Sequence, residues 1–144
     1  MTISRLRCWL LFFVSATFFL GNCTKKDDSK PLAAAITAQQ LTTGSWRLDE
    51  IVQNGQVTSS GAGIKDQYSL TFRTDGTYTQ KLLADNATFN GMWMLMSDGT
   101  VLHFIDHKGD VFEYTIANVA PTAFRYHFTN KNNQREERGF TAQP

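Results

Sequence analysis

Beyond residue 44, apolar and polar residues alternate along most of the chain, the pattern of strands with one buried face. The clearest alternating runs contain Tyr68, Leu70 and Phe72; Phe112, Tyr114 and Ile116; and Phe124, Tyr126 and Phe128. Helical spacing fits none of these runs. The pattern therefore predicts an all-β domain.

Turn signals separate the alternating runs at short intervals. They lie at Asn54–Gly55, Asp75–Gly76, Asp98–Gly99 and Gly109. Such residues accept the positive φ angles of tight hairpins, so neighbouring strands are expected to be antiparallel. Together, alternation and turns predict eight strands at residues 45–53, 67–73, 77–83, 89–96, 100–106, 111–118, 122–129 and 136–142.

A meander of eight strands with one apolar face is stabilised by curling until its first and last strands meet. A two-sheet sandwich would need the same alternation, but it usually has several long crossover connections. The only long connection here is "GQVTSSGAGIKDQ", residues 55–67, which favours the closed barrel. Before the first strand, Thr37 and Gln40 have capping-box spacing, which predicts a short helix.

The stretch "GMWMLMSDGT", residues 91–100, is apolar on both faces of its predicted strand. Its register places Trp93 on one face and Met92, Met94 and Met96 on the other, and the large aromatic area of Trp93 favours its face as the inner one. Neighbouring strands would add Val101, His103 and Ile105 to this outer face. Three interpretations stay open: the tether or a long loop covers these residues, they are scattered surface residues without a special role, or they contact a membrane or a protein partner.

The predicted interior is rich in large aromatic side chains. An eight-stranded barrel either is filled by its own residues or holds one small ligand. If there is a cavity, tyrosine hydroxyl groups would orient a mostly apolar ligand. The candidate ligand-binding residues are Trp46, Tyr68, Phe72, Tyr78, Trp93, Phe104, Tyr114 and Tyr126.

The first 22 residues have the layout of a signal peptide: Arg5 and Arg7, then an uncharged apolar run, then small residues. The following "LGNC" resembles a bacterial lipobox, although Asn22 departs from the usual pattern. This resemblance implies lipidation of Cys23, with residues 23–40 as a flexible tether. "CTKKDDSK" further resembles the signal that sends some lipoproteins to the cell surface. We therefore expect an outer-membrane or cell-surface protein, attached to the membrane by its lipid.

Processing at Cys23 also limits the chemistry of the mature domain. Cys8 would leave with the leader, so no disulfide or thiolate metal site is expected. Removing Arg5 and Arg7 leaves 12 of the 14 basic residues against 13 acidic ones, a balance that argues against nucleic-acid binding. The acids of "DHKGD", residues 106–110, are those of a solvated turn. No metal, cofactor or catalytic group is predicted, and we expect no enzyme activity.

Three segments carry a family resemblance: "LTTGSWRLDEIVQNG", "YSLTFRTDGTYT" and "GMWMLMSDGTVLHFID". They resemble the small lipocalin-like domains found behind bacterial lipoprotein leaders, over residues 41–142 of a domain spanning 41–144. The resemblance implies that Gly44 and Trp46 close one end of the barrel, with residues 38–43 as a helical plug. It also implies a late arginine over Trp46, for which Arg138 is the best-placed candidate and Arg135 the alternative.

Two functions follow from this resemblance and from the aromatic interior. The first is the binding or carriage of a small hydrophobic molecule without catalysis. The alternative is a protein-binding or structural envelope module, such as an inhibitor or an accessory of a larger complex. In that case the barrel would be filled, and Met92, Met94 and Met96 would form the contact surface.

Overall fold

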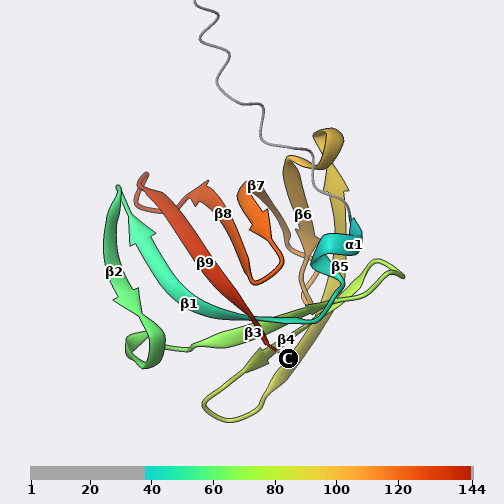
Figure 1. Ribbon diagram of the computed structural model, residues 1–144, viewed down its shortest axis with the longest axis horizontal. Helices are drawn as coiled ribbons and strands as arrows, with labels where there is room; N and C mark the ends of the chain where they lie inside the picture. The colour runs from blue at the N-terminus through green and yellow to red at the C-terminus, as the bar shows by residue number, and fades with distance from the viewer. Residues whose placement is uncertain (1–37, 144) are drawn as a thin grey trace, which may run out of the picture.

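The computed structural model describes residues 38–143, which form one short helix and a curled antiparallel sheet (Figure 1). The elements are α1 (Ala38–Leu41), β1 (Ser45–Gln53), β2 (Gln56–Ser60), β3 (Tyr68–Phe72), β4 (Thr77–Leu82), β5 (Thr88–Met96), β6 (Val101–Ile105), β7 (Val111–Ala120), β8 (Ala123–Thr129) and β9 (Arg135–Gln143). Single 3-10 turns lie at Gly61–Gly63 and Ser97–Gly99. No described helix is long and apolar enough to cross a bilayer.

Strands β3 to β9 pair in chain order, and β9 returns to pair with β1. Figure 1 shows β9 lying beside β1, which closes the wall. The prediction of an eight-stranded antiparallel barrel behind a short helix is therefore confirmed. The predicted leader and the lipidated Cys23 lie outside the described residues. Helix α1 begins at Ala38, inside the segment predicted as tether.

Strand β1 is paired on both edges. Its pairing with β9 extends from Ser45, opposite Gln143, to Gln53, opposite Glu136, with one irregularity after Leu48. The other edge pairs with β3 along residues 45–47 and with β2 along residues 50–53. One strand thus joins the two ends of the sheet and also carries the extra hairpin.

Strand β2 corrects one sequence-based prediction, because residues 56–60 were expected to be a loop. The hairpin is formed by Asn54 and Gly55, whose φ angles are 50° and 81°, as a tight two-residue turn requires. Four of the five residues of β2 are exposed, and Val57 is its only apolar residue. A strand that is wet on both faces shows no alternation, so the sequence pattern could not reveal it.

The side chains assigned to the barrel interior are mostly confirmed. Trp46 and Trp93 are 1% and 6% exposed, and both point inward as predicted. Three residues that the alternation did not select are also buried, namely Leu41, Ile64 and Phe140. Phe112 also faces the interior, where it lines a cavity, but its side chain is 41% exposed, because it lies near the start of β7 at the barrel mouth.

Helix α1 closes one end of the barrel through Trp46. The indole Nε1 donates a hydrogen bond of 2.8 Å to the backbone oxygen of Leu41, a residue with no solvent exposure. The Trp46 ring packs edge-on against Phe124 at 5.8 Å. A Cβ at Gly44 would lie 3.3 Å from the backbone oxygen of Gln143, so the chain approaches β9 closely here. This arrangement agrees with the predicted closing role of Gly44 and Trp46.

Gly91 is required by a close packing contact inside the barrel. It pairs with Tyr78 on β4, and the Tyr78 ring lies over it. A Cβ at this position would meet the backbone oxygen of Ile105 at 2.3 Å and the Tyr78 ring at 2.6 Å. Glycine at this position therefore lets the Tyr78 ring occupy the space that a side chain would fill.

Replacing Gly91 with Ala should destabilise the barrel, because the new methyl group must displace backbone or the Tyr78 ring. Overpacking of this kind costs about 1–3 kcal/mol, which corresponds to a fall in Tm of about 4 °C or more. The matched control is Gly63→Ala, where an added Cβ meets nothing within 4 Å. Thermal unfolding followed by circular dichroism measures both variants. Equal melting temperatures for the two would contradict the packing argument.

Candidate functional site

A cavity of about 280 Å³ lies at the end of the barrel away from α1. The two ends of β7 show this. Its last residues lie at the closed end, where Val119 pairs with Phe124, the residue that packs on Trp46. Its first residues lie at the other end, where Phe112 lines the cavity. The cavity is lined by Tyr68, Leu70, Tyr78, Gln80, Phe89, Phe104, Asp106, His107, Phe112, Tyr114, Tyr126 and Arg138.

Five of the eight predicted ligand-binding residues line this cavity: Tyr68, Tyr78, Phe104, Tyr114 and Tyr126. The other three, Trp46, Phe72 and Trp93, pack in the floor instead. Phe72 contacts Trp93 with ring centroids 5.0 Å apart, and the Trp93 Nε1 donates to the backbone oxygen of Arg73 at 3.0 Å. The barrel is therefore filled near α1 and hollow near its mouth.

The polar residues of the wall were not among the predicted ligand-binding residues. Gln80 and Asp106 each lie two residues beyond an inward aromatic ring, Tyr78 and Phe104, so strand alternation could have identified them. His107 carried no such signal. It lies in the turn after β6, where its ring packs on Phe89 with centroids 4.7 Å apart.

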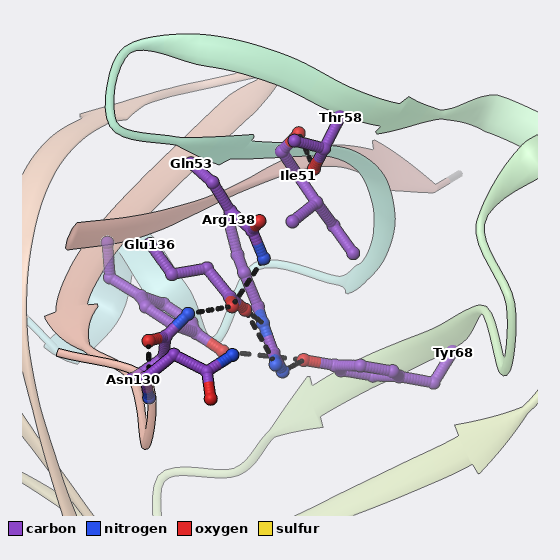
Figure 2. Close-up of polar contacts among 9 residues, drawn as sticks. Ile51, Gln53, Thr58, Tyr68, Asn130, Glu136 and Arg138 are labelled. Atoms are coloured by element: carbon purple, nitrogen blue, oxygen red, sulfur yellow. Dashed lines mark hydrogen bonds and ion pairs between the residues drawn. The ribbon is translucent and has the colours of Figure 1, made fainter. Parts of the chain in front are cut away.

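Glu136 and Arg138, both on β9, form a buried polar cluster beside the cavity (Figure 2). Glu136 is only 7% exposed. One of its oxygens accepts hydrogen bonds from the Nε and Nη2 atoms of Arg138, at 3.0 and 2.9 Å. The other oxygen accepts from the side-chain amides of Gln53 and Asn130, at 3.3 and 3.4 Å. The buried carboxylate is thus compensated on both oxygens.

Arg138 extends from this cluster to Tyr68 on β3. Its Nη1 donates to the Tyr68 hydroxyl at 2.9 Å, and that hydroxyl lies 3.3 Å from the Tyr126 hydroxyl. Burial opposes the charged form, but the oxygens of Tyr68 and Tyr126 and the hydrogen bonds with Tyr68 and Glu136 raise the Arg138 pKa above its ordinary value. The guanidinium is a cation at every physiological pH.

The predicted contact between Arg138 and Trp46 is wrong. The guanidinium lies over the Phe128 ring, 5.3 Å from its centroid. Strand register gives the reason: Arg138 pairs with Ile51, whereas Trp46 pairs with Ala142, nearer the closed end. Arg138 therefore serves the mouth of the barrel and not its floor.

Two tyrosine hydroxyls at the cavity have no partner. Within residues 38–143, the hydroxyl groups of Tyr78 and Tyr114 make no hydrogen bond, although both rings are packed against Phe104. Burial raises the pKa of Tyr114 to about 12 and raises that of Tyr78 as well. Both groups therefore stay protonated at neutral pH, and each can donate a hydrogen bond to a ligand.

The carboxylate of Asp106 is held by its own turn. It accepts hydrogen bonds from the backbone N–H groups of Lys108 and Asp110, at 2.8 and 2.9 Å. Burial alone would raise the pKa of Asp106, but these hydrogen bonds lower it, so the group is ionised at neutral pH. Among the described residues, no three acidic, histidine or cysteine side chains gather closely enough to hold a metal ion.

The barrel wall is open at one place beside the cavity. Residues 111–114 of β7 pair with β6, but within residues 38–143 their other edge has no strand partner, because β7 joins β8 only from Thr115 onward. Grooves of about 540 and 520 Å³ follow this gap and share Phe112 and Tyr114 with the cavity. The cavity is therefore reached from the barrel end and from the side.

The three methionines lie outside, as predicted. Met92, Met94 and Met96 are 55%, 51% and 38% exposed. Met94 pairs with His103, whose Nδ1 lies 3.4 Å from a carboxylate oxygen of Glu113. The apolar surface is therefore interrupted by a polar pair at its centre.

Replacing Arg138 with Ala should strongly destabilise the protein, because Glu136 would keep a buried charge without its main partner. Breaking a buried ion pair in this way costs about 3–5 kcal/mol. The control is Arg135→Ala on the same strand, whose side chain is 59% exposed and should change stability by less than about 1 kcal/mol. Urea unfolding gives both free energies. A loss for Arg138→Ala no larger than the control would show that the cluster is unimportant for stability.

No protein-family model and no curated protein matches the chain. Among solved structures, a DUF4847 family protein from Bacteroides vulgatus is 13% identical, with a TM-score of 0.49, over 72% of this chain and 96% of that one. A redesigned β-barrel is 14% identical, with a TM-score of 0.45, over 78% and 98% of the two chains. Another redesigned β-barrel, mFAP1 bound to DFHBI, is 19% identical, with a TM-score of 0.40, over 77% and 100%.

Proposed function

We propose that this chain is a lipid-anchored protein of the bacterial cell envelope, whose lipocalin-like barrel binds one small, mostly apolar molecule without transforming it. The lipid on Cys23 would hold it at the outer membrane or the cell surface. Binding at the barrel mouth is the central part of the proposal, and the anchor determines where it takes place.

The cavity is the observation that carries this proposal. Apolar and aromatic side chains make up most of its wall, and the hydroxyls of Tyr78 and Tyr114 supply a few polar groups, the composition of a typical ligand pocket. The acids beside it are already engaged, Glu136 by Arg138 and Asp106 by backbone N–H groups. A general base needs a free proton acceptor near the substrate, and neither of these two carboxylates is free, which favours binding over catalysis by them.

The proposed anchor is compatible with an accessible cavity. Residues 24–37 would connect the lipidated Cys23 to α1, and α1 closes the end of the barrel opposite the cavity. An attachment at that end leaves the cavity mouth free. A lipidated cysteine can anchor a protein stably because each buried methylene contributes about 0.8 kcal/mol and several acyl chains act together.

Mass spectrometry of the protein purified from its own host tests both parts of this proposal. Under denaturing conditions, the expected mass is that of residues 23–144 plus covalent acyl groups. Under native conditions, an additional small molecule should be bound to each chain and lost on denaturation. Gln80→Trp, which places a large ring in the cavity, should lack this molecule and keep its acyl groups. A native mass without additional ligand would contradict binding, and an unprocessed chain would contradict the anchor.

The exposed methionines favour a second candidate function, a contact surface for an envelope protein partner. Met92 and Met94 are more than half exposed on one face of β5, and a groove of about 390 Å³ lies beside them. Flexible thioether side chains suit an irregular protein surface. In this case the barrel would serve as a rigid support for its outer face.

The double substitution Met92→Ser and Met94→Ser distinguishes this second function. If the methionines bind a partner, chemical crosslinking in intact cells should lose the partner adduct several-fold in the variant. Val57→Ser is the matched control, since Val57 is 58% exposed on a different strand. An adduct that persists unchanged in the double variant would eliminate the second function.

A further inference from the structure

The size of the cavity limits the ligand. A cavity of about 150 Å³ is known to hold one benzene molecule, and the cavity here is about 280 Å³. The space therefore corresponds to a molecule of about two rings. A long acyl chain would not fit inside it and would extend into the side grooves that share Phe112 and Tyr114 with the cavity.

The rings that border the cavity favour a flat molecule. Phe112, Tyr114 and Tyr126 form a nearly parallel series, with interplanar angles of 6° and 18°. Phe104 meets Tyr114 at 65° and Tyr78 at 86°, so ring edges as well as ring faces are presented. An aromatic ligand would make stacked and edge-on ring contacts in such a site. An alkyl chain would only bury apolar surface, and it would lose conformational entropy on binding.

The charges at the wall oppose a carboxylate ligand. The cation of Arg138 is already compensated by Glu136, and Asp106 adds a negative charge at the mouth. The wall offers donors in the hydroxyls of Tyr78 and Tyr114 and in the N–H groups that Arg138 has not used for Glu136 and Tyr68, next to the acceptors of Gln80 and Asp106. Because the charge of Arg138 is already compensated, these donors suit a neutral acceptor, such as a carbonyl oxygen, better than an anion.

We propose that the cavity selects a flat, uncharged compound of about two aromatic rings that carries a carbonyl-type acceptor, and that the Tyr78 and Tyr114 hydroxyls bind this acceptor. The inference rests on the proposed binding function and specifies its ligand class. The rings determine the shape of the ligand, the hydroxyls determine its polar group, and the pairing of Arg138 with Glu136, together with the charge of Asp106, disfavours a negatively charged ligand.

Equilibrium dialysis with three probes tests the ligand class. Full-length protein in lipid nanodiscs is dialysed against 2-acetylnaphthalene, 2-ethylnaphthalene or decanoate, and empty nanodiscs correct for partition into lipid. The expected order of affinity is the acetyl probe, then the ethyl probe, then decanoate. Decanoate bound as tightly as the acetyl probe would overturn the inference while supporting the proposed function. If no probe binds above the empty nanodiscs, both the inference and the binding function fail.

The Tyr114→Phe variant tests the role of the hydroxyl. Loss of one neutral hydrogen bond should weaken binding of the acetyl probe about 2- to 10-fold and leave the ethyl probe unchanged. Thr58→Val is the control, because it removes an exposed hydroxyl on β2 that does not line the cavity. The Tyr78→Phe variant is measured in the same way. The assignment of these hydroxyls would be overturned if Tyr114→Phe weakened binding of both probes equally. It would also be overturned if neither Tyr114→Phe nor Tyr78→Phe changed the affinity for the acetyl probe.

Discussion

The pairing of β1 with β9 is the constraint on which the rest of the structure depends. It runs the length of β1, while the other edge of that strand is shared between β3 and β2. Closure joins strands at the two ends of the chain and gives every inward side chain a fixed set of neighbours across a narrow interior. The gap along residues 111–114 of β7 is therefore a local feature of a closed wall, and it lies where the cavity is.

Closure divides the interior into a filled floor and a hollow mouth. In the floor, the two indole N–H groups donate to the backbone oxygens of Leu41 and Arg73, which allows Trp46 and Trp93 to be almost fully buried. At the mouth, large rings are also present, but they end in hydroxyl groups. Tyr78 and Tyr114 keep these groups without partners in the described part of the chain. The same barrel therefore combines a stable base with a site that still has hydrogen-bonding capacity.

Much of the fold could be predicted because strand alternation and Asx-Gly turns are local signals. They identified the eight barrel strands, and the large aromatic area of Trp93 indicated its inward direction. Strand β2 was missed because a strand with two exposed faces has no alternation. The exposure of Phe112 was missed because it depends on where the wall opens. The site was predicted only in part. Alternation finds inward rings, but it cannot tell which of them fill the floor, since that depends on strand register across the barrel.

Arg138 shows how stability and ligand selection are linked. A carboxylate as buried as that of Glu136 is tolerated only when it is paired and hydrogen-bonded, and this requirement turns the guanidinium toward Glu136 and away from Trp46. The pairing leaves Arg138 with donors but without net attraction for an anion. A residue that the family resemblance assigned to closing the barrel thus adds no net charge to the cavity wall, because its neighbour two positions earlier is buried and carries the opposite charge.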